Sequence, residues 1–275
     1  IASPIAQALI DAHSWQYSRI VVGLVATIAS VVMSFLFVRD SPEKMGVPAY
    51  GDGEVDENRP VDAVRATEGA TRAQALATPG LYLVILIAAI IVMTAAFFQQ
   101  IPAYTAKSPL GAAAGAVAVS IVMIGGTVGK LVLGWLADRI GIKPTAIAAM
   151  LCGAAGMTMA FVATDHLVFY LGMVVFGVGY AGLTVIVPLL VRNSFGSLNY
   201  AEIYSWVSTG IFVSTAVSFL VYGRIVDLTG SFAWCFYLVI GLYLIAAVLI
   251  VPAVNLSRRA WARTDANKTT TLGVR

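Results

Sequence analysis

The sequence predicts an all-α protein that is embedded in a membrane. Of its 275 residues, 59% are hydrophobic and only 11% are charged, which is more apolar side chain than a soluble domain can bury. The apolar residues form long continuous runs of Ala, Leu, Val, Ile and Gly instead of alternating with polar ones, and this pattern favours helices over a β-barrel.

Seven runs are long enough to cross a hydrocarbon core about 30 Å thick, which takes about 20 helical residues. They cover residues 19–38, 80–106, 112–137, 144–163, 167–191, 203–223 and 232–252. Residues 1–10 are apolar too, but they make only half a span and no basic flank precedes them. We therefore expect them to be the end of a helix that begins upstream, in a longer protein of which this chain is a fragment.

Lys and Arg predict the orientation, because they gather in the cytoplasmic loops of membrane proteins. Thirteen fall in loops on one side of the spans, three (Arg19, Lys107 and Arg224) fall on the other, and Lys130 lies inside a span. The thirteen are Arg39, Lys44, Arg59, Arg65, Arg72, Arg139, Lys143, Arg192, Arg258, Arg259, Arg263, Lys268 and Arg275. We expect that side to be cytoplasmic, together with the C-terminus.

Two segments differ from the spans in composition. Residues 39–79 hold eight acids, five bases and four prolines, which is typical of a linker between membrane domains. Within this linker, residues 67–77 are rich in helix formers and predict a helix on the membrane surface. The predicted organisation is therefore a first membrane unit over 1–38, a linker over 39–79, a six-helix unit over 80–252, and a basic, flexible tail over 253–275.

Composition also excludes several kinds of site. Cys152 and Cys235 are isolated in apolar runs, so they form neither a disulfide framework nor a metal-type spacing. His13 and His166 are too few and too far apart for a metal cluster. A net charge of +3 is too small to indicate nucleic acid. We expect no metal, no cofactor and no nucleic-acid partner.

One charged loop stands out between two spans. Residues 134–143 read Gly-Trp-Leu-Ala-Asp-Arg-Ile-Gly-Ile-Lys. A glycine lets a neighbouring helix approach closely, and an aspartate at a helix end can accept from a facing helix N-terminus and pair with the next arginine. Contacts that form in one conformation and break in another make a gate. The alternative is an ordinary charged turn at the membrane surface.

This loop resembles the cytoplasmic signature of the major facilitator superfamily, Gly-x-Leu-x-Asp-Arg-x-Gly-Arg-Lys, in its second-half copy. The resemblance assigns the gating role to Gly134, Asp138, Arg139, Gly141 and Lys143. Ile142 stands where the pattern usually has a base, so we expect a weaker charge network than usual.

The resemblance extends over the chain and is strongest to monocarboxylate porters and oxalate/formate antiporters. It is carried by residues 4–15, 39–43, 71–79, 188–199 and 222–230. It implies the major facilitator fold, with the second six-helix bundle, transmembrane helix 6 and a remnant of helix 5. In that family the substrate site lies between two six-helix halves, near the bilayer midplane.

Lys130 is the first candidate for substrate binding. A charge inside the bilayer costs about 3 kcal/mol on insertion scales, so it should face a cavity or a partner. The resemblance places Lys130 where monocarboxylate porters carry a carboxylate-binding arginine, four residues before the glycine of the loop. The alternative is that its long stem snorkels to the cytoplasmic interface.

Two departures from these relatives shape the expected chemistry. Gly126 stands where monocarboxylate porters carry a proton-handling aspartate, and residues 203–222 lack the cation that oxalate/formate antiporters keep. A substrate with one negative charge is therefore more plausible than a dicarboxylate.

Further candidates lie on neighbouring spans. Gln99, Gln100 and Tyr104 cluster where Pro102 can break a helix, and they face either a ligand or the interface. The glycines at 125, 126 and 129 indicate close helix packing, and the alternative is that they also shape the cavity. The hydroxyls of residues 203–222 either line the pathway or bond to their own helix. They belong to Ser205, Ser208, Thr209, Ser214, Thr215 and Ser218.

Other classes of membrane protein fit the sequence less well. A retinal protein needs a buried lysine in its last helix, and residues 232–252 have none. A membrane enzyme lacks any His-Glu-x-x-His or Gly-x-Ser-x-Gly pattern here. Residues 177–182 fit Gly-x-Gly-x-x-Gly but lie inside a span, without the strand and turn of a dinucleotide site. Composition does not exclude a channel, but the loop signature favours alternating access instead.

The resulting expectation is a secondary active transporter, not an enzyme, in a bacterial inner membrane. It would move a small organic anion by alternating access, with a coupled proton or counter-anion, as a monomer in the lipid bilayer. The alternative on the same fold is an exporter of hydrophobic or drug-like compounds, for which Lys130 would be structural.

Overall fold

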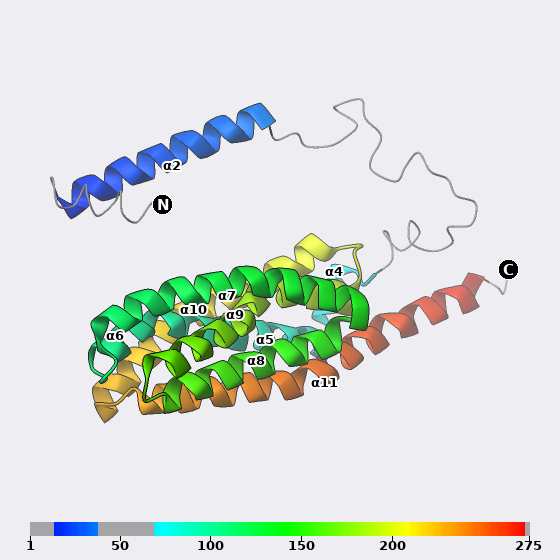
Figure 1. The fold of residues 1–275 in the computed structure, drawn as a ribbon. Coiled ribbons are helices and arrows are strands. Elements are labelled where there is room, and N and C mark those ends of the chain that lie inside the picture. The colour runs from blue at the N-terminus through cyan, green and yellow to red at the C-terminus, as the bar shows by residue number, and fades with distance from the viewer. Residues whose placement is uncertain (1–13, 38–68, 273–275) are drawn as a thin grey trace. The chain divides into compact units, whose positions relative to one another are not determined.

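The computed structural model describes residues 14–37 and 69–272, and they are almost entirely helical (Figure 1). Seven helical segments among these residues are long and apolar enough to cross a membrane. They are Trp15–Leu36, Pro79–Ala106, Ala113–Ile140, Ile142–Val162, His166–Phe195, Tyr200–Thr229 and Ala233–Arg258. The all-α membrane class and the seven predicted spans are therefore confirmed.

The chain divides into two compact units, residues 1–60 and 61–275. In the first unit, helix α2 (Trp15–Phe37) is apolar around its whole circumference, and its side chains are almost all exposed. A helix that is hydrophobic on every face is suited to lipid or to a partner helix. The expected helix-5 remnant in residues 1–10 lies outside the described residues.

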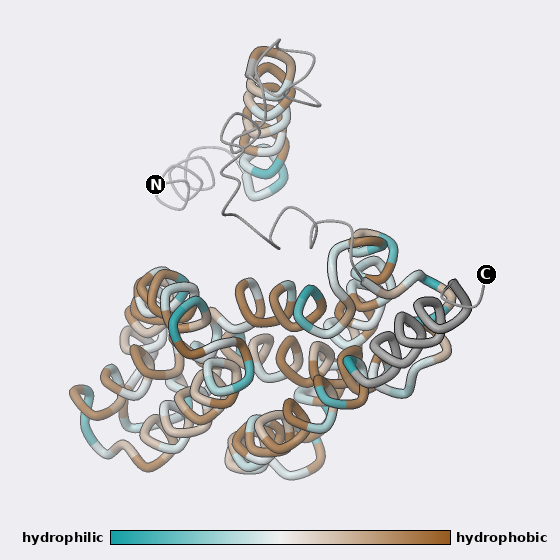
Figure 2. The backbone as a smooth tube through the Cα atoms, turned by 90° about the vertical axis from the view of Figure 1, so that its right-hand side faces the viewer, coloured by the Kyte–Doolittle hydropathy of each residue, from teal (hydrophilic) through white to brown (hydrophobic). Residues whose placement is uncertain are grey.

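The second unit is a bundle built on α9 (His166–Phe195). This helix packs most extensively on α8 (Ile142–Val162) and α7 (Gly111–Ile140), and it also contacts α5 (Pro79–Ala96), α11 (Ala233–Leu272) and α10 (Tyr200–Thr229). Hydrophobic residues run along these helices and hydrophilic ones gather near their ends (Figure 2). One continuous core joins them.

Glycines set how closely α9 approaches its neighbours. A Cβ added at Gly156 of α8 would lie 2.2 Å from the Phe176 backbone nitrogen of α9. One added at Gly177 of α9 would lie 2.8 Å from the Val122 carbonyl oxygen of α7. Both distances are far inside van der Waals contact, so these positions accept only glycine without a shift of a helix.

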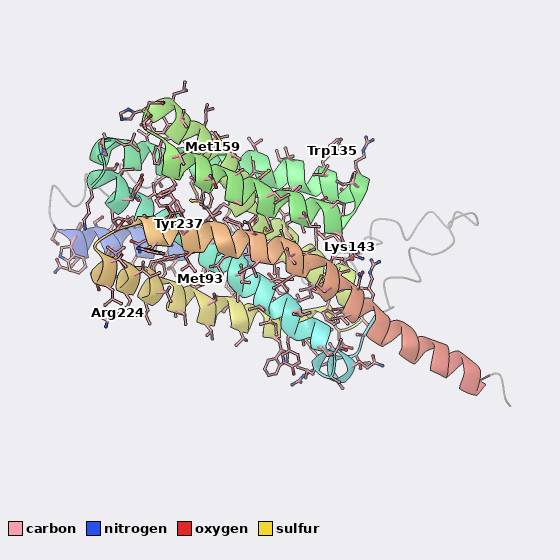
Figure 3. The ribbon with its side chains drawn as sticks, turned by 90° about the horizontal axis from the view of Figure 1, so that it is seen from below. Met93, Trp135, Lys143, Met159, Arg224 and Tyr237 are labelled. Carbon is pink, nitrogen blue, oxygen red and sulfur yellow. The ribbon has the colours of Figure 1, made fainter. Side chains whose placement is uncertain are left out.

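The two ends of this bundle are named here after their turn glycines. The Gly141 end holds the α7–α8 and α9–α10 connections and the start of α5; the Gly230 end holds the α6–α7, α8–α9 and α10–α11 connections. Trp135 and Lys143 lie at the first end and Arg224 at the opposite one (Figure 3).

The first span of the bundle is broken, as Pro102 predicts. Helix α5 gives way to a 3-10 turn, η2 (Phe97–Gln100), and then to α6 (Ile101–Ala106), with Pro102 in its first turn. Proline lacks the backbone N–H that a continuous helix needs, so the chain re-forms its helix from a new start. Near the break, the Tyr222 hydroxyl of α10 donates to the Met93 carbonyl, 2.7 Å away.

The end of the predicted linker is fastened to the bundle. The Ala70 backbone N–H donates to the Phe195 carbonyl at 2.8 Å, and Gly69 pairs with Gly196 in an isolated bridge. Helix α4 (Arg72–Leu76) follows, with Thr71 and Gln74 forming a reciprocal capping box. This helix is shorter than the predicted 67–77, and residues 39–68 lie outside the described part of the chain.

The C-terminal segment departs from the expected flexible tail. Helix α11 continues past Pro252 to Leu272, beyond the other helices of the bundle (Figure 1). Proline is tolerated there because neighbouring groups in a helix bundle can satisfy the carbonyl that it frees. Residues 253–263 are rich in the helix formers Ala, Leu and Arg, a propensity that the prediction gave too little weight.

Candidate functional site

The charged loop lies where α7 turns into α8. Gly141 has a positive φ of 85°, which favours glycine, and its N–H closes α7 on the Ala137 carbonyl at 3.0 Å. Its own carbonyl accepts the Thr145 hydroxyl at 2.8 Å in the first turn of α8. One glycine therefore ends one span and begins the next, so the loop needs no further residues.

The side chains of this loop make different contacts from those expected. The Arg139 guanidinium lies 5.3 Å from the ring centroid of Trp135, while Asp138 is exposed. The two make no ion pair, and none is present elsewhere among the residues that the structure describes. The expected Asp138–Arg139 pair is therefore absent from this conformation, because the guanidinium stacks on its own helix, one turn back.

Gly134 does not serve close packing inside this bundle. A Cβ added there would meet no atom within 4 Å. Any helix that approaches Gly134 must therefore come from outside the described bundle. Lys143, in contrast, is engaged, because its ammonium donates to the Asn255 side-chain oxygen of α11 at 2.5 Å. At the same end Arg258 donates to the Asn193 carbonyl of α9 at 3.0 Å.

Lys130 is exposed on α7, ten residues before the helix ends. At 1.5 Å per residue this is about 15 Å from the Gly141 end, well inside the span. Neither a hydrogen bond nor an ion pair engages its ammonium within the described bundle. An unpaired charge at that depth is costly, so the ammonium needs either a partner from outside the described bundle or a path for its stem to the solvated interface.

The glycines at 125, 126 and 129 lie where α7 packs against α9. Added Cβ atoms at Gly125 and Gly129 would collide with the α9 backbone at 2.7 and 2.9 Å, which supports the packing role. Gly126 instead faces a ring, because its Cβ would lie 3.4 Å from Cδ1 of Tyr180. This is ordinary contact, so Gly126 leaves room for the ring.

Tyr180 connects Lys130's helix to the break in the first span. Its ring lies 5.5 Å from that of Phe98 in η2, in an edge-on arrangement. Sequence reasoning missed Tyr180, because it lies within the Gly-x-Gly-x-x-Gly pattern that was discarded. The signal available was Gly126, a glycine at a position where the resembling porters carry a larger side chain.

The three other candidate ligands lie farther along the bundle. Gln99 is exposed and Gln100 half-buried in η2, about 30 Å along the span from its start by the helical rise. Tyr104 packs its ring edge-on against Phe236 at 4.9 Å and Phe232 at 6.0 Å. No contact joins these residues to Lys130 within the described chain, so the structure leaves the four candidates separate.

The hydroxyls of α10 mostly bond to their own helix. Thr209 donates to the Ser205 carbonyl at 3.0 Å, and Ser205, Thr215 and Ser218 make similar bonds three or four residues back. Ser214 is different, because it donates to the Ala89 carbonyl of α5 at 2.7 Å. Apart from Ser214, these bonds match the self-bonding alternative. Among the residues described, no group of His, Cys, Asp or Glu is arranged to hold a metal.

Comparison with known proteins gives one family. The model of the Major Facilitator Superfamily matches residues 110–270, more than half of the chain, and it includes the loop from Gly134 to Lys143. A search of the curated proteins gives no match. This is a family of membrane transporters, which agrees with the apolar spans of the described helical bundle. The chain belongs to the Major Facilitator Superfamily.

Proposed function

We propose that this protein is a secondary active transporter that moves a small, monocarboxylate-like organic anion by alternating access. The observation that carries the proposal is Lys130, an exposed ammonium about 15 Å inside a membrane span with no partner in the described bundle. A substrate carboxylate would compensate that charge during transport. The family membership supports a membrane transporter of small molecules.

The anion is expected to carry one negative charge. Within α10 the described residues between Ile203 and Tyr222 include no Lys or Arg, so a second cation facing Lys130 from this helix is lacking. A dicarboxylate would bring one uncompensated charge into a poorly solvated site, at a cost of several kcal/mol. Coupling to a proton or a counter-anion would use groups near the span ends or outside the described residues.

The surroundings of Lys130 suit a compact substrate. Gly126 lies one turn from Lys130 on α7, and the half-buried Tyr180 ring of α9 lies against Gly126. Phe98 of η2 contacts that ring in turn, next to Gln99. Gln99 and Gln100 remain our proposed polar contacts nearer the Gly230 end. Tyr104 is the weakest of the proposed ligands, because its ring is engaged with Phe232 and Phe236.

We assign the gate to Gly134, Asp138, Arg139, Gly141 and Lys143. The open backbone at Gly134 and the exposed carboxylate of Asp138 are available to a helix from outside the bundle. Such a helix would contact them in one conformation only. The stacked Arg139 can then exchange Trp135 for Asp138 or for the incoming helix.

The proposed arrangement in the cell follows the distribution of bases. The Gly141 end, with Arg139, Lys143, Arg192 and Arg258, would face the cytoplasm of a bacterial inner membrane, and the C-terminus with it. The bundle from 80 to 252 would be the second half of the transporter. Residues 1–38 would close the first half, and the protein would act as a monomer.

Export of hydrophobic or drug-like compounds is the second candidate. The observation in its favour is the pair of half-buried aromatic rings, Phe98 and Tyr180, beside Gly126. In that case the Lys130 stem would carry its ammonium toward the Gly141 end, where it would be solvated.

Uptake distinguishes the two candidates. Cells that express the natural full-length protein would be given a panel of labelled monocarboxylates, with and without a pH gradient. We expect saturable uptake of at least one monocarboxylate, and its loss in Lys130→Gln. Normal uptake in Lys130→Gln, or efflux of hydrophobic dyes without any anion transport, would contradict the anion proposal.

A further inference from the structure

A polar pocket opens at the Gly141 end, between α4 and the first turns of α10. Arg72 of α4 and Glu202, Ser205, Trp206 and Thr209 of α10 line it. Its volume is about 270 Å³, slightly below the range of pockets that enclose drug-sized ligands. It therefore suits a small polar group, and it lies apart from Lys130 and the gating loop.

Two opposite charges enter this pocket without pairing. Arg72 and Glu202 are both exposed, and they form no ion pair with each other or with other residues described here. A guanidinium offers a planar fork that matches a phosphate, and a carboxylate accepts from an ammonium. The pocket therefore fits a ligand that carries both a phosphate and a cationic nitrogen.

The hydroxyls favour a ligand that donates hydrogen bonds. Ser205 donates to the Glu202 carbonyl at 2.6 Å, and Thr209 donates to the Ser205 carbonyl at 3.0 Å. Each hydroxyl has one proton, which is thus used within α10, so both oxygens present lone pairs to the pocket. An ammonium with N–H groups can donate to them, whereas a trimethylammonium cannot.

The rest of α10 provides an apolar path from the pocket. Glu202, Ser205, Trp206 and Thr209 follow the helical i, i+3, i+4, i+7 spacing, and the same face continues through Phe212, Val213, Ala216, Val217 and Leu220. Phe212 is 72% exposed and Leu220 is 74% exposed. Trp206, 42% exposed between the polar and apolar parts, is the residue type that marks a membrane interface.

We propose that this pocket binds the headgroup of a phospholipid that carries a phosphate and a primary ammonium, with its acyl chains along the apolar face of α10. Arg72 binds the phosphate, and Glu202 with the two hydroxyls binds the ammonium. A purely anionic lipid would meet the Glu202 carboxylate, and a choline lipid would leave the hydroxyl oxygens without donors. The ligand is thus of the phosphatidylethanolamine class.

The test measures lipid binding to the purified full-length protein by native mass spectrometry. Dioleoyl phosphatidylethanolamine, phosphatidylcholine and phosphatidylglycerol would be titrated with matched acyl chains. We expect the ethanolamine lipid to bind about tenfold more tightly than either of the others, the effect of one charge-assisted contact. Equal binding of the three lipids overturns the proposal.

Variants of the pocket residues test whether the lipid binds at this site. Arg72→Gln and Glu202→Gln should each remove most of the preference, and Arg72→Lys should keep part of it. Arg224→Gln is the matched control, because Arg224 is an exposed cation on the same helix at the opposite end (Figure 3). Loss of the preference in the control, or its survival in both pocket variants, contradicts the assignment.

Other occupants give distinct results. If soluble glycerophosphoethanolamine competes as well as the lipid at equal concentration, the pocket takes a free phosphoamine and the lipid proposal fails. If the wild type binds no ethanolamine lipid until the acidic residues of the 39–68 segment are neutralised, a carboxylate of the chain itself fills the pocket, and the proposal also fails.

Discussion

Replacing Gly156 by alanine tests how the bundle is held together. This glycine lies on α8 against α9, the helix on which the bundle is built. An added Cβ would lie 2.2 Å from the Phe176 nitrogen and 2.6 Å from the Gly172 oxygen, both of them backbone atoms. Ordinary contact begins near 3.4 Å, so the two helices must separate by about 1 Å.

The cost follows from that separation. Forcing extra volume into a well-packed interface costs about 1–3 kcal/mol, and a shift of the α8 and α9 backbones engages the whole interface. The higher helix propensity of alanine offsets less than about 1 kcal/mol of this loss in stability. The net loss is about 1–2 kcal/mol, which for a bundle of this size corresponds to a fall in melting temperature of about 2–8 °C.

The chain carries its own reporter for this measurement. Cys235 is fully buried and Cys152 is half-buried, so a thiol-reactive dye becomes fluorescent when the detergent-solubilised protein unfolds. Gly223→Ala is the control, because a Cβ there would meet nothing within 4 Å. We expect the control to melt at or above the wild-type temperature. A Gly156→Ala variant that melts with the control would refute the close approach of α8 and α9.

Two further predictions concern the α5 break and the gate. Tyr222→Phe should destabilise the bundle by about 1–3 kcal/mol, because it leaves the Met93 carbonyl without its donor; an unchanged melting curve would show that this bond contributes nothing. Asp138→Asn should slow transport while leaving membrane insertion and thermal stability unchanged, because Asp138 is exposed and unpaired within the described bundle. Unchanged turnover in that variant would show that the loop is an ordinary charged turn and not a gate.

The spans could be predicted because each is a long run of apolar residues, and lipid requires every backbone group to be bonded within its own helix. The same reasoning located the break at Pro102, since proline removes a specific hydrogen bond. Gly141 was marked only by a motif, but its positive φ explains why a glycine stands there.

Contacts between distant segments could not be predicted. The bond from Ala70 to the Phe195 carbonyl joins two backbones 125 positions apart, and nothing in either side chain signals it. Arg139 stacks on Trp135, four residues back on the same face of α7, whereas the adjacent Asp138 does not face Arg139 on the helix. The position of the Tyr180 ring against Gly126 was found only from the structure, because nothing in the sequence pairs these two residues.

The helix after Pro252 shows how one signal can outweigh another. Its polar and basic composition indicated a flexible tail, because the prediction judged order from hydropathy. Helix propensity acts independently of hydropathy, and α11 continues through these residues. The span over 232–252 was therefore predicted, but the point at which its helix ends was not.

Binding of a monocarboxylate to Lys130 variants tests the central claim most directly. Affinity would be measured for the labelled anion that the wild type transports, in wild type, Lys130→Arg and Lys130→Gln. Loss of one charge-assisted contact predicts about 10–150-fold weaker binding in Lys130→Gln, and a smaller loss in Lys130→Arg. Equal affinity in Lys130→Gln and wild type would show that the ammonium does not bind the substrate, and would contradict the account of Lys130 as the anion site.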